Sequence, residues 1–369
     1  MKTSKIYWTS ILLLLITGCT LSPKETGGNI QYDVFYTKPL APLQLQEVST
    51  KYRYISIETN KNSLIGEIKT PIMRKNDNYY IDDQSCIFIF DRNGKHLKTF
   101  DRQGQGPGEY GLYFCSTVND KGDIVLLTGG SKIIYNYNSK GDFVSKISLD
   151  SLHTDGIAFI NDTLLLLHDI ERTNGYKYHV LNLLSQQVQN TFYPMKYRKH
   201  YSMRRDCLTS NDGKIQVSQY QSNEILEITK DSAYVKYILN INDKMPPEGY
   251  WEESTSDIFD YRNKGYIGDV ECFAEGKKDI LFRFRGIGEE RQGFALVEKR
   301  TGSHIVFDEL ILAEGLNIKP SYFHSLGNGK ICFLINPIQI LESGNNDFIT
   351  QFPGLEDDSN PILLEIELE

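Results

Sequence analysis

The sequence predicts an all-β fold, a single six-bladed β-propeller with four-stranded blades. Three observations support this prediction. Aromatic residues suited to sheets are plentiful, with 23 tyrosines and 18 phenylalanines; convincing amphipathic helices are scarce; and one strand–turn–strand unit recurs along the chain. The 369 residues are enough to bury the core of one closed repeat architecture. The same length fits two sandwich domains with a boundary near residue 200, which is the alternative fold.

The clearest copy of the repeated unit spans residues 79–100. It contains three short apolar strands separated by two turns: Tyr79–Ile81, Asp82–Ser85, Cys86–Phe90, Asp91–Gly94 and His96–Phe100. In the second turn, an Asp side chain can cap backbone N–H groups, and a glycine can adopt the positive φ that other residues resist. This segment therefore predicts three strands of one propeller blade.

Weaker copies of the unit follow along the rest of the chain. They begin near Asp123, Thr163, Gly213, Asp279 and Gly329. The mean spacing is roughly fifty residues, which is typical of four-stranded propeller blades. Because a ring of sheets must close or expose unpaired edges, we expect Tyr54–Glu58 to pair with Ile362–Glu367 in a shared blade.

The N-terminus has the pattern of a secretory signal. Lys2 and Lys5 precede a short apolar run that ends in Ile16–Cys19, and the run is too short to span a membrane. This ending resembles the bacterial lipobox, in which the cysteine is lipidated and the preceding peptide is removed. An ordinary signal peptide with a chance cysteine is the alternative. The predicted organisation is a signal peptide at 1–18, lipidated Cys19 with a tether at 19–45, and a propeller at 46–369.

Charge and cysteine usage exclude several classes of partner and site. Removing residues 1–18 leaves 38 basic against 48 acidic residues, a formal charge of −10, so nucleic acid is not an expected partner. Attachment to the membrane would depend on the lipid, since no polybasic patch is present. The remaining cysteines are widely spaced without a Cys-x-x-Cys pair, which predicts buried thiols and leaves one disulfide open: Cys86, Cys115, Cys207, Cys272 and Cys332.

Several segments carry a resemblance to a known family. They are residues 54–59 with 64–66, residues 87–95, residues 104–110 and residues 360–363. Together they resemble the six-bladed β-propeller lipoproteins of uncharacterised function in the TolB-like and NHL-like propeller group. The resemblance is dense in residues 54–110 and thin between about 150 and 310. It implies the fold and a lipid-anchored location, and it supplies no catalytic residues. Because Thr20 follows Cys19 without a run of acidic residues, we expect attachment to the outer membrane, on its periplasmic face or at the cell surface.

The glycine-rich segment Gly104–Tyr110 is the sharpest internal motif. As a ligand-binding loop at the mouth of the funnel, it would present a polar set of side chains: Arg102, Gln103, Gln105, Glu109 and Tyr110. As a structural corner between two blades, its glycines would supply unusual backbone conformations and Glu109 would cap a turn. It is not a phosphate-binding loop, because the Lys-Ser/Thr of a P-loop is missing and no helix follows.

Two further sets of residues are candidate sites. His168 and His324 are the best metal ligands if a central site binds a divalent cation, although single histidines near strand ends are commonly hydrogen-bonded structural residues. Trp251, in the acidic and aromatic segment 248–260, suits contact with a glycan or peptide, or pins a solvated loop. A small basic stretch is expected to be a solvated face: Arg198, Lys199, Arg204 and Arg205.

These observations favour a non-enzymatic binding or scaffold propeller for a glycan, a peptide or an envelope protein, with no cofactor. No Gly-x-Ser-x-Gly nucleophile elbow is present in the sequence. The alternative function is a metal-dependent lyase or hydrolase with its site in the central funnel.

Overall fold

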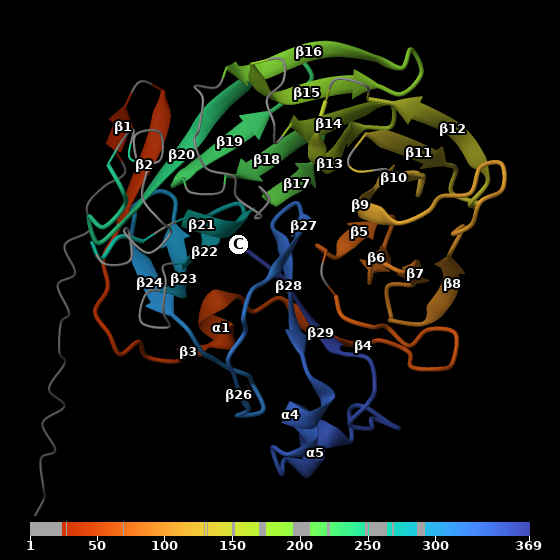
Figure 1. Ribbon diagram of the computed structural model, residues 1–369. Helices are drawn as coiled ribbons and strands as arrows, with labels where there is room; N and C mark the ends of the chain where they lie inside the picture. Colours follow the sequence, from red (N-terminus) through yellow and green to blue (C-terminus); the bar gives the residue numbers. More distant parts are fainter. Residues whose placement is uncertain are drawn as a thin grey trace, which may run out of the picture.

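In the computed structural model the chain is an all-β propeller whose sheets stand around a central axis (Figure 1). The described residues include three short helices: α1 (Leu45–Val48), α4 (Pro337–Leu341) and α5 (Asn346–Ile349). No helix in the described residues is long and apolar enough to cross a membrane. The structure describes residues 24–26, 28–68, 70–128, 130, 132–149, 152–169, 175–194, 207–219, 222–247, 250, 264–267, 269–285 and 292–369.

Six sheets each contain four antiparallel strands in a row. From the innermost strand outward, blade 1 consists of β5 (Met73–Lys75), β6 (Asn78–Asp82), β7 (Ile87–Phe90) and β8 (His96–Phe100), and blade 2 of β9 (Tyr113–Val118), β10 (Ile124–Thr128), β11 (Ile133–Tyr137) and β12 (Phe143–Ser148). Blade 3 consists of β13 (Thr154–Asn161), β14 (Leu164–Asp169), β15 (Tyr176–Asn182) and β16 (Gln187–Pro194), and blade 4 of β17 (Cys207–Asn211), β18 (Lys214–Ser218), β19 (Glu224–Ile228) and β20 (Ala233–Ile241). Blade 5 consists of β21 (Asp269–Glu275), β22 (Asp279–Arg285), β23 (Gln292–Glu298) and β24 (His304–Phe307), and the closing blade of β27 (His324–Gly327), β28 (Lys330–Ile335), β29 (Ile362–Glu367) and β4 (Tyr52–Ser56).

The predicted count of six blades is wrong, because the described strands form seven sheets. The seventh, here the small blade, consists of three strands of two residues each: β3 (Leu43–Gln44), β25 (Leu310–Ile311) and β26 (Asn317–Ile318). It packs in one apolar cluster with blade 5 and the closing blade. Strands this short show no hydrophobic alternation, and β3 pairs in parallel with a segment far away in sequence. Sequence periodicity therefore gave no sign of this blade.

The N-terminal segment adds further strands that the prediction lacked. β2 (Asn29–Val34) pairs in parallel with β20, from Ile30 opposite Tyr237 to Val34 opposite Ile241, and β1 (Lys24–Thr26) pairs with β2. The sheet of blade 4 therefore has six strands rather than the predicted four. Tyr32 and Val34 are buried between blades 4 and 5. Residues 24–44, within the segment assigned to a tether, thus contribute strands to two sheets.

The closing blade contains β29, the last strand, together with β4, whereas the first strands of the chain, β1 and β2, join blade 4. β29 pairs with β4, from Ile362 opposite Ser56 to Ile366 opposite Tyr52, which agrees with the predicted pairing of these segments. Beyond β29, the carbonyl oxygen of Glu369 accepts hydrogen bonds from the backbone N–H groups of Lys278 and Asp279 in blade 5. The last residues of the chain therefore join the closing blade to blade 5.

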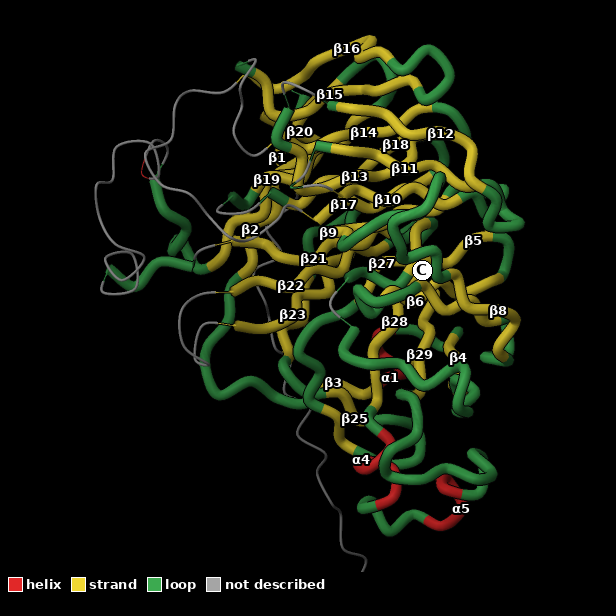
Figure 2. Tube along the Cα trace, turned by 45° about the vertical axis from the view of Figure 1, so that its right-hand side comes forward, coloured by secondary structure: helices red, strands yellow, loops and turns green. Residues whose placement is uncertain are grey.

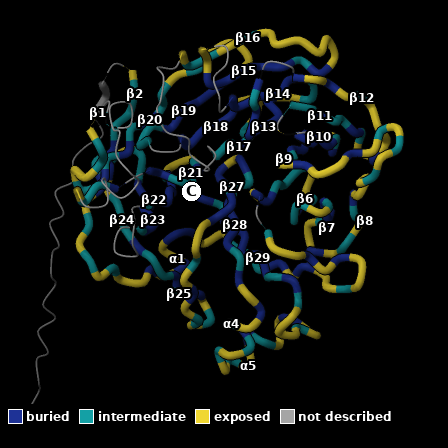
Figure 3. The backbone as a smooth tube through the Cα atoms, viewed as in Figure 1, coloured by how far each residue is buried: buried dark blue, intermediate teal, exposed yellow. Residues whose placement is uncertain are grey.

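Apolar side chains fill the space between neighbouring blades. Leu127 and Leu167 belong to the cluster between blades 2 and 3, for example, and Leu166 and Leu226 to the cluster between blades 3 and 4. The middle strands of the large blades are accordingly buried, whereas the outermost strands and the turns are more exposed (Figure 3). Because every large blade is buried on both faces, its strands read as short continuous apolar runs.

The tight turns confirm the predicted turn chemistry. Asp91 Oδ1 accepts hydrogen bonds from the backbone N–H groups of Asn93 at 2.8 Å and Lys95 at 2.9 Å. Gly94 adopts a φ of 83°, and a Cβ at this position would lie 2.1 Å from the carbonyl oxygen of Ser56. Asn119 and Asn138 cap equivalent five-residue turns in blade 2. The recurring Asx turn is therefore a structural part of the repeat.

The antiparallel order gives the propeller two distinct faces. Figure 2 shows the blades from a second angle. One, here the turn face, carries the tight turns that follow each innermost strand, including residues 76–77, 212–213 and 328–329. The other, here the loop face, carries the connections from an outer strand to the next blade, including residues 101–112.

Candidate functional site

The loop Gly104–Tyr110 lies on the loop face, between blades 1 and 2. Glu109 Oε2 accepts a hydrogen bond from the backbone N–H of Gly106 at 2.7 Å. A Cβ at Gly104 would lie only 1.9 Å from the same carboxylate oxygen, so a larger residue there would displace the Glu109 side chain. Tyr110 is buried, and its hydroxyl accepts from the backbone N–H of Arg102 at 3.3 Å. Glu109 and Tyr110 thus hold the loop together, while the side chains of Arg102, Gln103 and Gln105 are exposed.

Several predicted residues lie outside the described part of the chain. These are the lipid attachment site Cys19, the aromatic candidate Trp251 and the basic residues Arg198, Lys199, Arg204 and Arg205. Their assignments remain predictions.

The two candidate metal ligands lie in different blades and have different partners. His168, on β14, is hydrogen-bonded through Nδ1 to the carboxylate of Asp155 on β13. His324, on β27, accepts a hydrogen bond at Nδ1 from the backbone N–H of Ile72 at 3.1 Å. Within the described residues, no group of three or more His, Cys, Asp or Glu side chains is placed to hold a metal ion.

His324 is the more unusual of the two histidines. It is 4% exposed, and its Nε2 has no hydrogen-bond partner in the described part of the protein. Burial lowers the pKa of the imidazole from its usual 6.5 to about 4. The folded protein therefore keeps His324 neutral at physiological pH.

A cavity of about 270 Å³ lies along the axis between the innermost strands. Blades 1 to 4 and the closing blade contribute to its wall, which includes Cys115, Asp155 and Cys207. A second hollow, of about 410 Å³, lies at its end on the turn face. Arg74 and Lys75 line both hollows, and they form ion pairs with Asp77 and Asp120. The cations at this end of the axis are therefore already paired.

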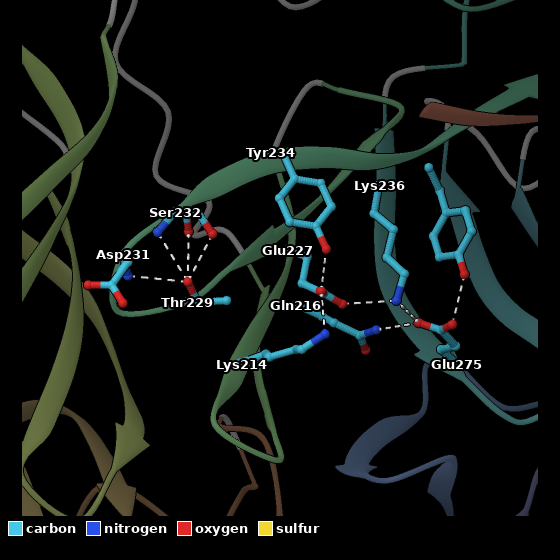
Figure 4. Close-up of polar contacts among 10 residues, drawn as sticks. Lys214, Gln216, Glu227, Thr229, Asp231, Ser232, Tyr234, Lys236 and Glu275 are labelled. Carbon is cyan, nitrogen blue, oxygen red and sulfur yellow. Dashed lines mark hydrogen bonds and ion pairs between the residues drawn. The ribbon is translucent and has the colours of Figure 1, made fainter. Parts of the chain in front are cut away.

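A cluster of charges joins blades 4 and 5 near the turn face (Figure 4). Glu227 accepts from Lys214 at 2.7 Å and from Lys236 at 2.9 Å, and Lys236 also reaches Glu275 at 2.8 Å. Burial alone would raise the pKa of Glu227, but hydrogen bonds from Lys214, Tyr234 and Lys236 outweigh it and lower the pKa to about 2. Because each acid is satisfied by several donors within the cluster, we interpret it as a clamp between blades.

The loop face carries a larger pocket of about 530 Å³ near the axis, where blade 5 meets the closing blade. Polar and charged side chains dominate its lining. It is formed by Ser218, Asp269, Val270, Glu271, Cys272, Arg283, Arg285, Gln292, Ser321 and Tyr322. Burial, with Cys207 nearby, raises the pKa of the Cys272 thiol well above its usual value, so this thiol is not an activated nucleophile.

Strand register brings the charged side chains of this loop-face pocket together. Arg283 and Arg285 are two residues apart on β22, so both lie on the same face of the sheet. The pairing of β21 with β22 shifts between Val270 and Cys272, and Glu271 lies at this irregularity. β-bulges of this kind redirect a side chain and are common beside functional sites.

The contacts of these side chains define the polar wall of the pocket. Both arginines form ion pairs with Glu271. Arg285 Nη1 lies 3.1 Å from Glu271 Oε1. Arg283 also donates from Nη2 to Gln292 Oε1 at 3.1 Å. Arg283 is buried, whereas the Arg285 side chain is 42% exposed. Arg285 is therefore the accessible cation of the pocket.

Apolar side chains are exposed on the same face. Tyr322, in the pocket wall, is 39% exposed, and its ring makes an edge contact with His324 at a centroid distance of 5.0 Å. Leu112 and Phe114, at the start of blade 2, are 78% and 39% exposed. The loop face thus combines a charged pocket with exposed apolar and aromatic groups, as ligand-binding surfaces do.

Comparison with known protein families identifies the family of this chain. The model of the family described as "Domain of unknown function (DUF4934)" matches residues 29–367. The chain belongs to the DUF4934 family. The match begins at the first residue of β2 and ends at the last residue of β29. The DUF4934 domain therefore includes the N-terminal strand that pairs with blade 4.

Solved structures agree with the fold. A candidate exported protein of Bacteroides fragilis NCTC 9343 is 14% identical, with a TM-score of 0.73 over 92% of this chain and 99% of that one. A DUF4221 family member from Bacteroides vulgatus ATCC 8482 is 9% identical, with a TM-score of 0.53 over 85% and 97%. At these identities the likeness shows the fold alone. No curated protein matches the sequence at a significant level.

The sequence prediction missed the loop-face pocket. Its strongest signal is Phe282-Arg283-Phe284-Arg285, in which aromatic and basic residues alternate along one strand. Such alternation places both arginines on one face and both rings on the other. The contact with Glu271 could not be found this way, because it depends on the pairing register and on the irregularity in β21.

Proposed function

We propose that this DUF4934 protein is a lipid-anchored binding module of the cell envelope, and that it binds a polar ligand in the loop-face pocket. The single observation that supports this site best is the arrangement of Arg283 and Arg285 around Glu271 in a pocket of about 530 Å³. This volume is within the roughly 300–1,000 Å³ of small-molecule sites.

The proposed location depends on the N-terminal signal. Residues 1–18 would be removed, and Cys19 would carry the lipid at the outer membrane. β1 begins at Lys24, only a few residues after Cys19, so the anchor would hold blade 4 close to the bilayer. The description of the Bacteroides fragilis relative as a candidate exported protein supports export. We also propose that the chain is related to the TolB-like and NHL-like propellers.

A metal-dependent lyase or hydrolase with its site in the axial cavity is the second candidate. The observation in its favour is the hydrogen-bonded pair of His168 and Asp155, because Asp155 lines that cavity. A histidine oriented by a carboxylate is a common general base. We rank this function second because, within the described residues, no third His, Cys, Asp or Glu joins this pair to complete a metal site.

Ligand-induced thermal shifts test the proposed site. The purified chain 20–369 would be screened against sugars, amino acids and short peptides, with Arg285→Ala as the site variant. Arg300→Ala is the matched control, because Arg300 is an exposed arginine of the same blade, paired with Glu298 outside the pocket lining. We expect shifts in the wild type and in Arg300→Ala that Arg285→Ala loses. Equal shifts in all three proteins would exclude this pocket.

Export and lipidation have a separate test. Incorporation of a clickable fatty acid should label the wild-type protein in cells and leave Cys19→Ala unlabelled. Equal labelling of both proteins would contradict the anchor and would leave the binding proposal to be judged on the pocket alone.

A further inference from the structure

The charge balance of the loop-face pocket restricts what it can bind. Among the described residues in its lining, Arg283 and Arg285 face Asp269 and Glu271, so positive and negative formal charges are equal in number. Such a pocket produces no strong net field for an ion, in contrast to the single-signed clefts that attract charged ligands. A ligand without net charge suits it best.

The existing contacts argue further against an anionic ligand. Glu271 already receives both guanidinium groups, and Arg283 is held on its other side by Gln292. A ligand carboxylate or phosphate would compete with Glu271 for these donors and would leave Glu271 as a partly buried charge without its pairing. Breaking such a pair is strongly unfavourable.

What the pocket offers instead is donors and acceptors side by side. A carboxylate has about four acceptor positions, and a guanidinium has five N–H donors. The Gln292 amide contributes a donor and an acceptor on one group, and Ser321 adds a hydroxyl. Hydroxyl groups both donate and accept, so two neighbouring hydroxyls can bridge an adjacent Arg and Glu without separating them.

Tyr322 supplies the remaining element of recognition. Its exposed ring forms part of the pocket wall, and aromatic rings pack against the apolar C–H face of a sugar. From these features together we propose that the loop-face pocket binds an uncharged polyhydroxylated ligand, namely a neutral oligosaccharide. This inference depends on the proposed function, because it assigns a ligand class to the same site.

A panel of oligosaccharides with different charges tests the ligand class. Neutral, uronic-acid-containing and amino-sugar-containing oligosaccharides would be titrated calorimetrically into the chain 20–369 at 50 mM and 500 mM NaCl. We expect binding of neutral members with a Kd that changes less than twofold between the two salt concentrations, because no net charge is neutralised. Tyr322→Ala, Gln292→Ala and Arg285→Ala should each raise the Kd about tenfold or more, and Arg300→Ala should not.

The possible outcomes separate the two proposals. Salt-sensitive binding of acidic oligosaccharides or peptides that Arg285→Ala abolishes would overturn the neutral-ligand inference and keep the binding site. Neutral binding that is the same in Arg285→Ala and Arg300→Ala would overturn both. No binding of any oligosaccharide, by a protein whose circular dichroism confirms its sheet content, would also overturn the neutral-ligand inference.

Discussion

Replacing His324 with Asn should make the protein less sensitive to acid. Ile72 N–H donates to Nδ1 of this buried histidine, and the amide oxygen of Asn can accept the same hydrogen bond. The imidazole has a pKa of about 4 in the folded protein, against a usual value of 6.5. Asn carries no titrating group, so the comparison isolates the protonation of the histidine.

The magnitude follows from the difference between the two pKa values. Between pH 6.5 and pH 4 the unfolded chain binds a proton at this position and the folded chain does not, so stability falls as the pH falls. Each pKa unit corresponds to about 1.4 kcal/mol, so His324 costs the wild type about 3 kcal/mol of unfolding free energy between pH 7 and pH 4. Carboxylates also titrate in this range, but they do so in both proteins.

Urea denaturation at several pH values measures this effect. The free energy of unfolding of the wild type, minus that of His324→Asn, should fall by about 3 kcal/mol from pH 7 to pH 4. A difference that stays constant within about 0.5 kcal/mol would refute the argument that burial keeps this imidazole neutral.

Three further predictions concern the stability of the fold. Glu227→Gln should lower the unfolding free energy by about 3 kcal/mol at pH 7. This loss should shrink as the pH falls from 4.5 to 2, because the folded carboxylate has a pKa of about 2. Urea denaturation of both proteins at pH 7 and at pH 2 checks this. Gly94→Ala should lower the unfolding free energy by clearly more than the roughly 1 kcal/mol expected for Gly130→Ala, because only the change at residue 94 places a Cβ against a backbone oxygen. Thermal denaturation of the two variants measures this difference. Deleting residues 368–369 should lower stability by about 2–4 kcal/mol, because the buried Leu368 and two backbone hydrogen bonds to blade 5 are lost; an unchanged melting temperature would contradict the role of the C-terminus in closure.

The sequence was most informative where the fold depends on local chemistry. The turn Asp91–Gly94 and its strands could be predicted because the capping side chain and the positive-φ glycine lie within a few residues of each other. The need to close a ring predicted that Tyr54–Glu58 pairs with Ile362–Glu367, and the strand that pairs there is Tyr52–Ser56. The small blade could not be predicted, because Leu43–Gln44 is too short to show any period.

The candidate site was harder to predict because long-range register decides it. For Glu109 the sequence left ligand binding and turn capping open, and its carboxylate accepts a hydrogen bond from the N–H of Gly106 within the same loop, as the capping alternative predicts. Glu271 and Arg283 come together only through the pairing of two strands and the irregularity between Val270 and Cys272. A single sequence shows the alternation of Phe and Arg on β22 but not the carboxylate that lies opposite.

Hydrogen–deuterium exchange with a bound ligand tests the central claim most directly, because it maps binding onto individual strands. The mature chain would be measured alone and with the tightest-binding neutral oligosaccharide of the panel. We predict slower exchange in peptides covering residues 269–272, 283–285 and 321–324, and unchanged exchange in the turn-face peptides around residues 76–77 and 328–329. Protection confined to the turn face or to the outer strands would contradict the assignment of the loop-face pocket as the binding site.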